Sequence, residues 1–492
     1  GSPAPRHQVC TDLKTVSRPN AAFLIGLVMD TTPPSAIPVH PQAAPVVSFF
    51  EALKFWLRLG FISFGGPAGQ IAIMHRELVE EKRWISENRF LHALNYCMVL
   101  PGPEAQQLAT YIGWLMHRTW GGVVAGGLFV LPSLFILMGL SWIYVAFGSV
   151  PWVAGLLYGI KPAVAALVLQ AVHRIGSKTL KKPSVAPVLW VVAAMSFIAV
   201  AFLGVPFPWV VLVAALTGWF GQRLVPRQFS GGSGHGAAKA HAITPRPALI
   251  DDDTPTPPHA RFKKSRLARV LVAGALLWLL PMGVLMAWQG WSGAVTQMGW
   301  FFTKAALLTF GGAYAVLPYV YQGAVEHFGW LSGLQMMDGL ALGETTPGPL
   351  IMVVAFVGFV GGWSKQVLGP DALFLGAALA ATVVTWFTFL PSFLFILAGG
   401  PLVEATHGKL GFTAPLTAIT AAVVGVIASL AVFFMTHILI KSGAGALAGR
   451  IDWFAAAITA AAAFALWRLK MGVIPVIAAC ACAGLALKLI GI

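Results

Sequence analysis

The chain has 492 residues; 58% of them are hydrophobic, only 10% are charged, and the formal net charge is +15. This composition excludes a soluble globular protein, because too little polar surface would remain to cover the fold. Five uncharged stretches each exceed the roughly 18 to 20 residues that span a bilayer: 121–151, 183–222, 270–302, 372–403 and 410–440. The sequence therefore predicts an all-α, polytopic membrane protein.

The positive charges fall in the loops between these apolar stretches, which is typical of the cytoplasmic loops of a membrane protein. No nucleic-acid-binding motif is present, so we expect a lipid bilayer and no nucleic acid as partner. The 4 cysteines give no disulfide framework and the 12 histidines show no ligand spacing, so neither a metal site nor a cofactor is predicted. The absence of a GxxxxGKS/T loop excludes an ATP-driven motor, and no nucleophile–base pair points to an enzyme.

Residues 1–47 are expected to form a flexible tail. Gly1-Ser2 resembles a tag-cleavage scar, and Met29 is a candidate natural start. The apolar stretch 21–28 is too short to span a membrane.

A comparison of the chain with itself reveals a repeat at a distance of 246 positions. The matched pairs are Ser63-Phe64-Gly65-Gly66 with Thr309-Phe310-Gly311-Gly312, Pro101-Gly102-Pro103 with Pro347-Gly348-Pro349, and Arg58 with Lys304. Further along, "LPSLFIL" from Leu131 meets "LPSFLFIL" from Leu390 at a distance of 259. The sequence therefore predicts two homologous halves.

Four clear spans follow the broken segments of the first half, at about 121–147, 152–173, 185–203 and 206–223. Because this number is even, the first half begins and ends on one side of the membrane. A basic loop, 224–268, and one unmatched helix, 269–289, then bring the second half to the opposite side. We therefore expect inverted repeats at 48–223 and 290–492, as in many secondary transporters.

Loop charges orient this arrangement. The 173–182 and 224–268 segments are strongly basic, which predicts that they are cytoplasmic. The linker after the first Gly-Gly is also basic, whereas its counterpart has no Lys or Arg; this favours broken segments that turn back as hairpins over segments that cross fully. Trp84 and Trp330, in the two linkers, are expected as anchors at the membrane interface.

Each half carries two helix breaks within apolar sequence. Two successive glycines lack Cβ and permit positive φ, and Pro-Gly-Pro removes two backbone donors. Such breaks survive in hydrocarbon only where they are buried in protein or line a cavity. Pro103 and Pro349 suit the first turn of a new half-helix, whose free N–H groups and positive dipole end attract an anion. The alternative is a set of packing kinks, but two motifs repeated at one distance favour binding.

Side chains near the breaks complete the candidate site. Arg58 and Lys304 are matched cations in apolar surroundings and together suit a dianion; the alternative for Arg58 is that it snorkels to the interface. Glu104 and Glu344 flank the Pro-Gly-Pro motifs and are candidate proton-coupling groups, because a carboxyl group beside an anion favours its neutral form. For Glu104 the alternative is a carboxylate that satisfies a helix N-terminus. Further candidate ligands are Ser63, Thr309, Thr345, Thr346 and Gln106.

These motifs resemble those of the chromate ion transporter family, in its long-chain form with two fused homologous domains. The resemblance is carried by "GFISFGGP", "EEKRWIS", "LPGPEAQQLATYIG" and "LPSLFIL", and in the second half by "LLTFGGAYAVLPYV", "ALGETTPGPLIMVVAFVG" and "LPSFLFIL". It covers about residues 50–490 apart from the 224–268 loop. The second half has Ala313 where the first has a proline, so the halves are not expected to be chemically equal.

The resemblance implies a multi-pass protein of the bacterial inner membrane that exports chromate and confers chromate resistance, with sulfate as a competing analogue. Moving a dianion through 100 mV is worth about 4.6 kcal/mol, so the membrane potential favours its exit, and proton antiport would add to this. The alternatives are an importer of sulfate or another oxyanion, an oxyanion channel, and a chromate reductase; the last lacks flavin, haem or paired-cysteine motifs. The coupling ion and a homodimer are left open.

Overall fold

The computed structural model describes residues 47–64, 66–148, 150–229, 248–310, 312–406, 413–440 and 451–490. Within these ranges the chain is helical apart from two isolated β-bridges. Five of the described helices are long and apolar enough to cross a membrane: α4 (Glu104–Phe147), α5 (Pro151–Thr179), α9 (Lys264–Gln289), α14 (Leu373–Thr406) and α15 (Thr413–Leu439). The all-α, polytopic class is thereby confirmed. The expected tail lies outside the described residues except for Val47.

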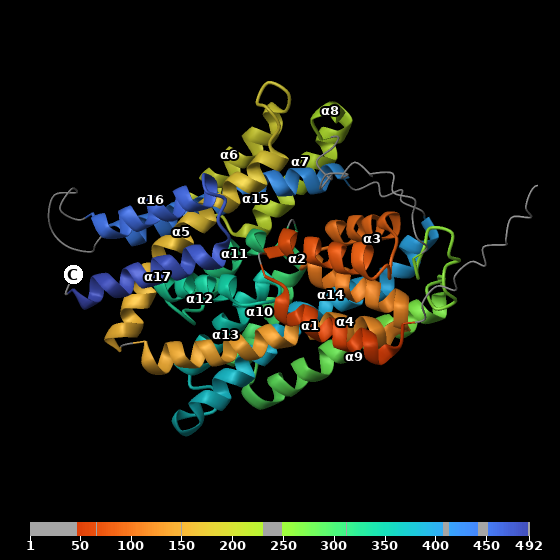
Figure 1. The fold of residues 1–492 in the computed structure, drawn as a ribbon, viewed down its shortest axis with the longest axis horizontal. Helices are drawn as coiled ribbons and strands as arrows, with labels where there is room; N and C mark the ends of the chain where they lie inside the picture. The colour runs from red at the N-terminus through yellow and green to blue at the C-terminus, as the bar shows by residue number, and fades with distance from the viewer. Residues whose placement is uncertain are drawn as a thin grey trace, which may run out of the picture. The chain divides into compact units, whose positions relative to one another are not determined.

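The remaining helices follow the predicted order (Figure 1). In the first half they are α1 (Phe49–Ile62), α2 (Gly66–His75), η1 (Arg76–Glu81), α3 (Glu87–Val99), α6 (Pro187–Ala201), α7 (Phe207–Leu224) and α8 (Pro226–Phe229). In the second half they are α10 (Ala294–Leu308), α11 (Ala313–Tyr321), η2 (Gln322–His327), α12 (Gly333–Thr345), η3 (Leu350–Met352), α13 (Val353–Ser364), η4 (Pro370–Ala372), α16 (Trp453–Trp467) and α17 (Val473–Leu489).

The repeated sequence is also a repeated backbone geometry. The π-helical turns η1 and η2 are 246 positions apart, and serine N-caps begin both α3 and α12. Trp84 N–H donates to the Leu78 carbonyl oxygen and Trp330 N–H to the Ala324 carbonyl oxygen, both at 2.8 Å. Both tryptophans are buried, so their expected place as interface anchors is wrong. Their rings fill the space beneath each linker because the π-turn brings the backbone over them.

The halves differ where their second hairpin ends. In the first half α4 continues through a kink at His117 and Arg118, and Arg118 has a φ of +58°. In the second half α13 ends at Ser364, and a turn with η4 precedes α14. The longer turn explains why the distance between matched residues grows from 246 to 259 along the chain.

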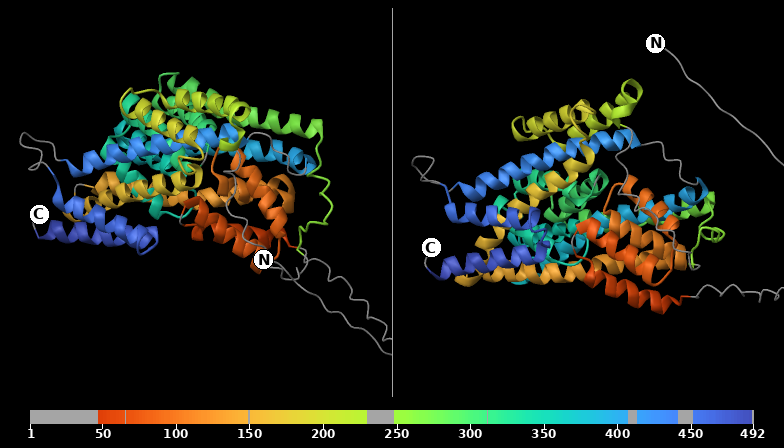
Figure 2. Two further views of the ribbon diagram at one scale, coloured as in Figure 1. Left: turned by 90° about the horizontal axis from the view of Figure 1, so that it is seen from above. Right: turned by 45° about the horizontal axis from the view of Figure 1, so that its top comes forward.

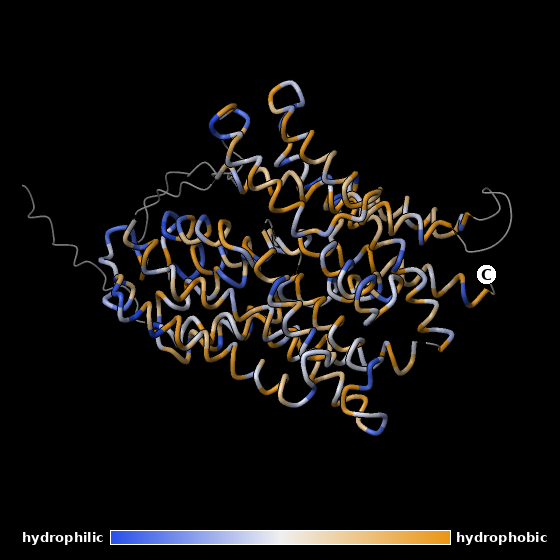
Figure 3. Tube along the Cα trace, turned by 180° about the vertical axis from the view of Figure 1, so that it is seen from behind, coloured by the Kyte–Doolittle hydropathy of each residue, from blue (hydrophilic) through white to orange (hydrophobic). Residues whose placement is uncertain are grey.

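Small residues bring the transmembrane helices close together. α5 lies against α15, α16 and α17 (Figures 1 and 2). A Cβ added at Gly159 would collide with the Cys480 carbonyl oxygen, and one added at Gly484 would collide with the backbone of Gly159. Such contacts drive helix association where lipid removes the hydrophobic force. Apolar residues run along most helices in Figure 3, and hydrophilic ones gather at the turns.

One end of the molecule collects the start of α1, the η1–α3 linker and the α4 kink. His117 Nε2 lies 3.0 Å from the Val47 carbonyl oxygen. Residues 248–263, which the sequence assigns to a loop, pack against the same end, and we name them the strap. Leu249 N–H donates to the Arg83 carbonyl oxygen at 3.0 Å, and His259 Nε2 lies 2.9 Å from the Trp114 carbonyl oxygen.

Asp252 fastens the strap most directly. Its two carboxylate oxygens accept hydrogen bonds from Ser86 Oγ and Asn88 Nδ2, each at 2.6 Å. The strap leads into α9, whose 26 residues extend about 39 Å. At the far end of α9, Gln289 Nε2 donates to the Val367 carbonyl oxygen, and Ser364 Oγ donates to the Trp330 carbonyl oxygen. The broken segments of the first half thus start and finish at the strap end, and those of the second half at the other end.

Candidate functional site

The broken segments of the two halves are hydrogen-bonded to each other. Gly102 N–H donates to the Thr309 carbonyl oxygen and Gly348 N–H donates to the Ser63 carbonyl oxygen, both at 2.8 Å. Each Pro-Gly-Pro motif therefore meets the Gly-Gly break of the opposite half. We name this region, residues 62–66, 101–103, 308–312 and 347–349, the crossing. Gly65 and Gly311 lie outside the described residues.

The backbone at the crossing requires glycine. The φ angles are +69° at Gly66, +98° at Gly312, +126° at Gly102 and +108° at Gly348. Side chains with L chirality rarely adopt such values. Just before the glycine pairs, Phe64 N–H and Phe310 N–H each donate at 3.0 Å to the carbonyl two residues earlier. Matched turns therefore open both helices at the same place.

Each Pro-Gly-Pro motif directly precedes a new helix, as predicted. Pro103 is the N-cap of α4 and Pro349 is the N-cap of η3, which continues into α13. The first N–H groups of a helix have no partner within it. Together with the helix dipole, they make each start suitable for an anion.

Two serines of the "LPS" motifs cover the crossing, and the sequence interpretation did not single them out. A Cβ added at Gly102 would collide with Ser392 Oγ, and one added at Gly348 would lie 2.8 Å from Ser133 Cβ. Ser133 and Ser392 are 259 positions apart and both are buried. Each serine therefore packs on the Pro-Gly-Pro motif of the opposite half.

The four hydroxyl groups expected to bind the anion are bonded to the backbone in this structure. Each donates to a carbonyl oxygen three or four residues earlier: Ser63 to Leu59 at 2.6 Å, Thr309 to Ala305 at 2.7 Å, and Thr345 and Thr346 to Leu342 at 3.0 and 2.6 Å. These bonds satisfy the last carbonyls of α1, α10 and α12. A bound anion would have to compete for these protons.

Three buried amides surround the crossing from the first half alone. Gln70 Nε2 donates to the Gly348 carbonyl oxygen at 2.5 Å, and Gln107 Nε2 donates to the Pro101 carbonyl oxygen at 2.8 Å. Gln106, the one amide that the sequence predicted, donates to a threonine hydroxyl in its own helix. Within the described ranges, the Oε1 atom of each of the three is buried without a hydrogen-bond partner. Buried polar atoms of this kind indicate ordered water or a ligand.

The matched cations lie on exposed faces and do not join the crossing in this conformation. The Arg58 side chain is 64% exposed, and its Nη2 lies 3.5 Å from Oε1 of Glu77, whose side chain is 4% exposed. Lys304 is exposed and its Nζ lies 5.7 Å from the Trp300 ring centroid. The structure thus brings the breaks together, but not the two positive charges.

The two candidate acids have different surroundings. Glu344 is buried and accepts a hydrogen bond from the Tyr314 hydroxyl, while the Arg174 guanidinium lies 5.6 Å from the Tyr314 ring centroid. Glu104 is the first residue of α4 and is partly exposed. The carboxyl group of the second half is therefore held in a network that joins α5, α11 and α12.

Buried polar contacts also join the halves away from the crossing. At the strap end, Arg89 of α3 pairs with Glu404 of α14 at 2.9 Å. Nearer the other end, Asp338 of α12 accepts from the Tyr144 hydroxyl of α4 at 2.9 Å and lies 3.5 Å from Lys161 Nζ. These contacts use helix pairs related by the repeat.

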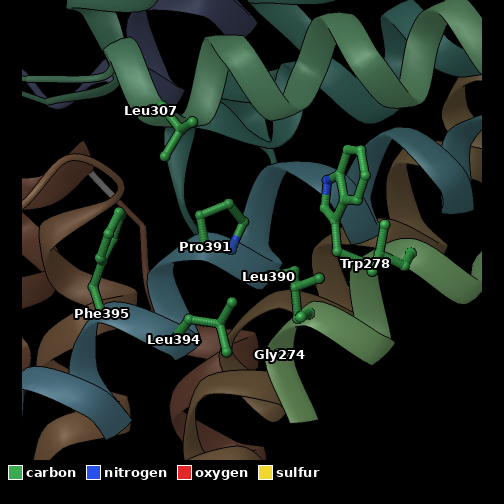
Figure 4. A pocket seen from close by; sticks show the side chains of 9 residues that line it. Gly274, Trp278, Leu307, Leu390, Pro391, Leu394 and Phe395 are labelled. Atoms are coloured by element: carbon green, nitrogen blue, oxygen red, sulfur yellow. The ribbon is translucent and has the colours of Figure 1, made fainter. Parts of the chain in front are cut away.

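An apolar groove of about 420 Å³ lies between α9, α10 and α14 (Figure 4). Trp278 Nε1 is the polar atom nearest to it and donates to Thr303 Oγ1 at 3.0 Å. The groove offers no donors to an anion, so it is not the candidate site. Its lining is Gly274, Ala275, Trp278, Leu279, Leu307, Leu390, Pro391, Leu394 and Phe395.

Comparison with known proteins identifies the lineage. The family model described as "Chromate transporter" matches the chain twice, at residues 50–219 and 296–485. The chain belongs to the chromate transporter family. Its two matches make it a long-chain member, and the family is one of transporters.

Named relatives agree with this assignment. A chromate transport protein of Cupriavidus metallidurans is 30% identical over 81% of this chain and 84% of its own length. A chromate transport protein of Pseudomonas aeruginosa is 34% identical over 78% of this chain and 80% of its own. A probable chromate transport protein of Synechococcus elongatus is 29% identical over 76% of this chain and 80% of its own. No solved structure matches the chain significantly.

Proposed function

We propose that this chromate transporter family member is a secondary transporter that exports chromate across the bacterial inner membrane and confers chromate resistance. The observation that carries the proposal is the crossing, where Gly102 N–H meets Thr309 and Gly348 N–H meets Ser63 across the two halves. Helices broken at one buried point are how transporters present backbone N–H groups and dipole ends to a substrate. A tetrahedral dianion fits this donor chemistry.

The proposed arrangement is a pair of inverted repeats whose hairpins enter from opposite sides of the membrane. In each half, both broken segments start and finish at one end of the molecule. Helix α1 has 14 residues, or about 21 Å, which is less than the roughly 30 Å of a hydrocarbon core. Hairpins of this length end near the membrane midplane, and the strap end would be cytoplasmic because the adjoining segments are basic.

Burial of the crossing supports a carrier over a channel. Ser63, Thr309, Gly102 and Gly348 are all buried, so no continuous aqueous path passes between them in this conformation. A carrier requires such a closed state between its two open ones.

Charge and coupling complete the proposal. Arg58 and Lys304 would draw the dianion toward the hairpins when the crossing opens to one side. Glu104 and Glu344 would exchange protons with the departing anion, which gives antiport. The membrane potential alone contributes about 4.6 kcal/mol per 100 mV to the exit of a dianion. Sulfate, with the same shape and charge, would compete.

Everted membrane vesicles test the proposal. We expect chromate to accumulate inside them against its concentration gradient when the interior is positive, with further accumulation when the interior is acidic. Equilibration without accumulation would identify a channel. Accumulation of sulfate but not chromate, or flux only in the opposite direction, would identify an importer of another oxyanion.

A further inference from the structure

Arg89 lies near the start of α3, at the strap end of the molecule. Its Nη1 donates to Glu404 Oε2 at 2.9 Å, and the Glu404 side chain is only 1% exposed. The other Glu404 oxygen accepts from the Tyr111 hydroxyl. The guanidinium is therefore held in place from one side by a buried carboxylate that is itself fixed.

The other edge of the guanidinium is free. Nε and Nη2 of Arg89 are both buried, and neither has a hydrogen-bond partner within the described part of the chain. These two N–H bonds run parallel along one edge of the planar group, which is the edge that grips carboxylates, phosphates and other oxyanions bidentately. Leaving charged donors buried and unsatisfied is unfavourable, so the geometry indicates a ligand with two acceptor oxygens.

The surroundings favour an oxyanion at this edge. Arg89 sits where α3, α4 and α14 meet, among aromatic residues: Tyr96 donates to the Phe395 carbonyl oxygen at 2.9 Å, and the Trp114 ring packs on Gly400. Apolar neighbours lower the local dielectric and strengthen a charged hydrogen bond. Glu404 lies on the opposite edge, where it orients the guanidinium without covering its free donors.

We propose that the Nε–Nη2 edge of Arg89 is an entry site that binds a tetrahedral oxyanion of the chromate and sulfate type before it reaches the crossing. Along α3, Arg89 is about 18 Å from Pro101. The site is therefore distinct from the crossing and lies toward the end that carries the strap. The inference rests on the proposed function for its substrate class.

The test is chromate uptake into everted vesicles, with the half-saturation concentration and the maximal rate measured separately. Arg89→Lys keeps the charge and one bond to Glu404 but cannot offer a two-donor edge. We expect its half-saturation concentration to rise about tenfold, with a maximal rate within about twofold of wild type, as the loss of one charged hydrogen bond predicts. Glu404→Gln still accepts from Nη1 but removes the competing negative charge, so it should lower the half-saturation concentration. Arg76→Lys, at an exposed arginine paired with Glu81, is the matched control.

The outcomes separate this inference from the proposed function. If wild type transports chromate and Arg89→Lys has the same half-saturation concentration, water satisfies the free edge and the inference is wrong. If Arg89→Lys and Glu404→Gln both weaken transport and both lower thermal stability, the pair is structural and the inference is again wrong. If wild type moves no chromate under any gradient, the proposed function fails as well. Opposite shifts for the two variants, with Arg76→Lys unchanged, support the entry site.

Discussion

Gly102→Ala is the sharpest perturbation of the crossing. Alanine at a φ of +126° is strained by about 1 to 3 kcal/mol. Its Cβ would also collide with Ser392 Oγ and lie 2.6 Å from Gln107 Nε2, and such overpacking typically costs about 1 to 3 kcal/mol. We therefore expect the free energy of unfolding to fall by roughly 2 to 6 kcal/mol. Transport should fall with it, because the Gly102 N–H can no longer reach Thr309.

The assay is unfolding of the purified protein in mixed detergent micelles, with a matched control. Gly139 lies inside α4 with no atom within 4 Å of an added Cβ, so Gly139→Ala should be neutral or stabilising by about 0.5 to 1 kcal/mol. Adding Ser392→Ala to Gly102→Ala removes the collision but not the strain, and should restore part of the loss. A Gly102→Ala protein as stable as wild type, or a double variant with no recovery, would refute the packing described for the crossing.

Three further changes test the contacts around the crossing. Gln70→Leu removes the side-chain donor shared by the broken segments of both halves, and we expect at least a tenfold slower chromate uptake with a well-folded protein, checked by size-exclusion chromatography. Asp252→Ala should release the strap, seen as faster hydrogen exchange of residues 248–263. Burial lowers the pKa of His259, so the neutral ring is favoured in the fold, and the same exchange should quicken as pH falls below about 6.5. Lys161→Met alone leaves the Asp338 carboxylate buried without its cation and should cost about 3 to 5 kcal/mol, whereas adding Asp338→Leu should recover much of it in a double-mutant cycle.

The helix breaks and their repeat could be predicted from the sequence. Glycine pairs and Pro-Gly-Pro have few alternatives in an apolar helix, and matched positions report matched geometry when a chain is duplicated. For this reason the ends of α1 and α10 and the starts of α4 and η3 agree with the motifs. The contact between Pro-Gly-Pro of one half and Gly-Gly of the other depends on how the halves pack, which no local pattern specifies.

The residues that the sequence interpretation missed are of two kinds. Gln70 and Gln107 occupy positions where the second half has Val316 and Val353, so a search for matched residues passed over them. Ser133 and Ser392 are matched, but a single serine in an apolar helix is ordinarily a packing residue. The cations show the reverse error of weight: Arg58 and Lys304 are matched, yet sequence spacing does not say which face of α1 or α10 they occupy.

Arg89 and the strap were hidden for a different reason. An arginine in the first turn of a helix after a charged linker looks like a surface residue, and its partner Glu404 is more than 300 positions away in the chain. The strap has the Pro-rich, polar composition of a loop. Only the side chains of the η1–α3 linker, which meet it in space, give it a fixed place.

The most direct test of the central claim is to locate chromate in the protein. Chromium scatters X-rays anomalously, so crystals grown with chromate report its position independently of the protein atoms. The account predicts an anomalous peak at the crossing, within hydrogen-bond distance of the first backbone N–H groups of α4 or η3. A protein that transports chromate but shows chromium only at exposed cations such as Arg58 and Lys304, with none at the crossing, would contradict it.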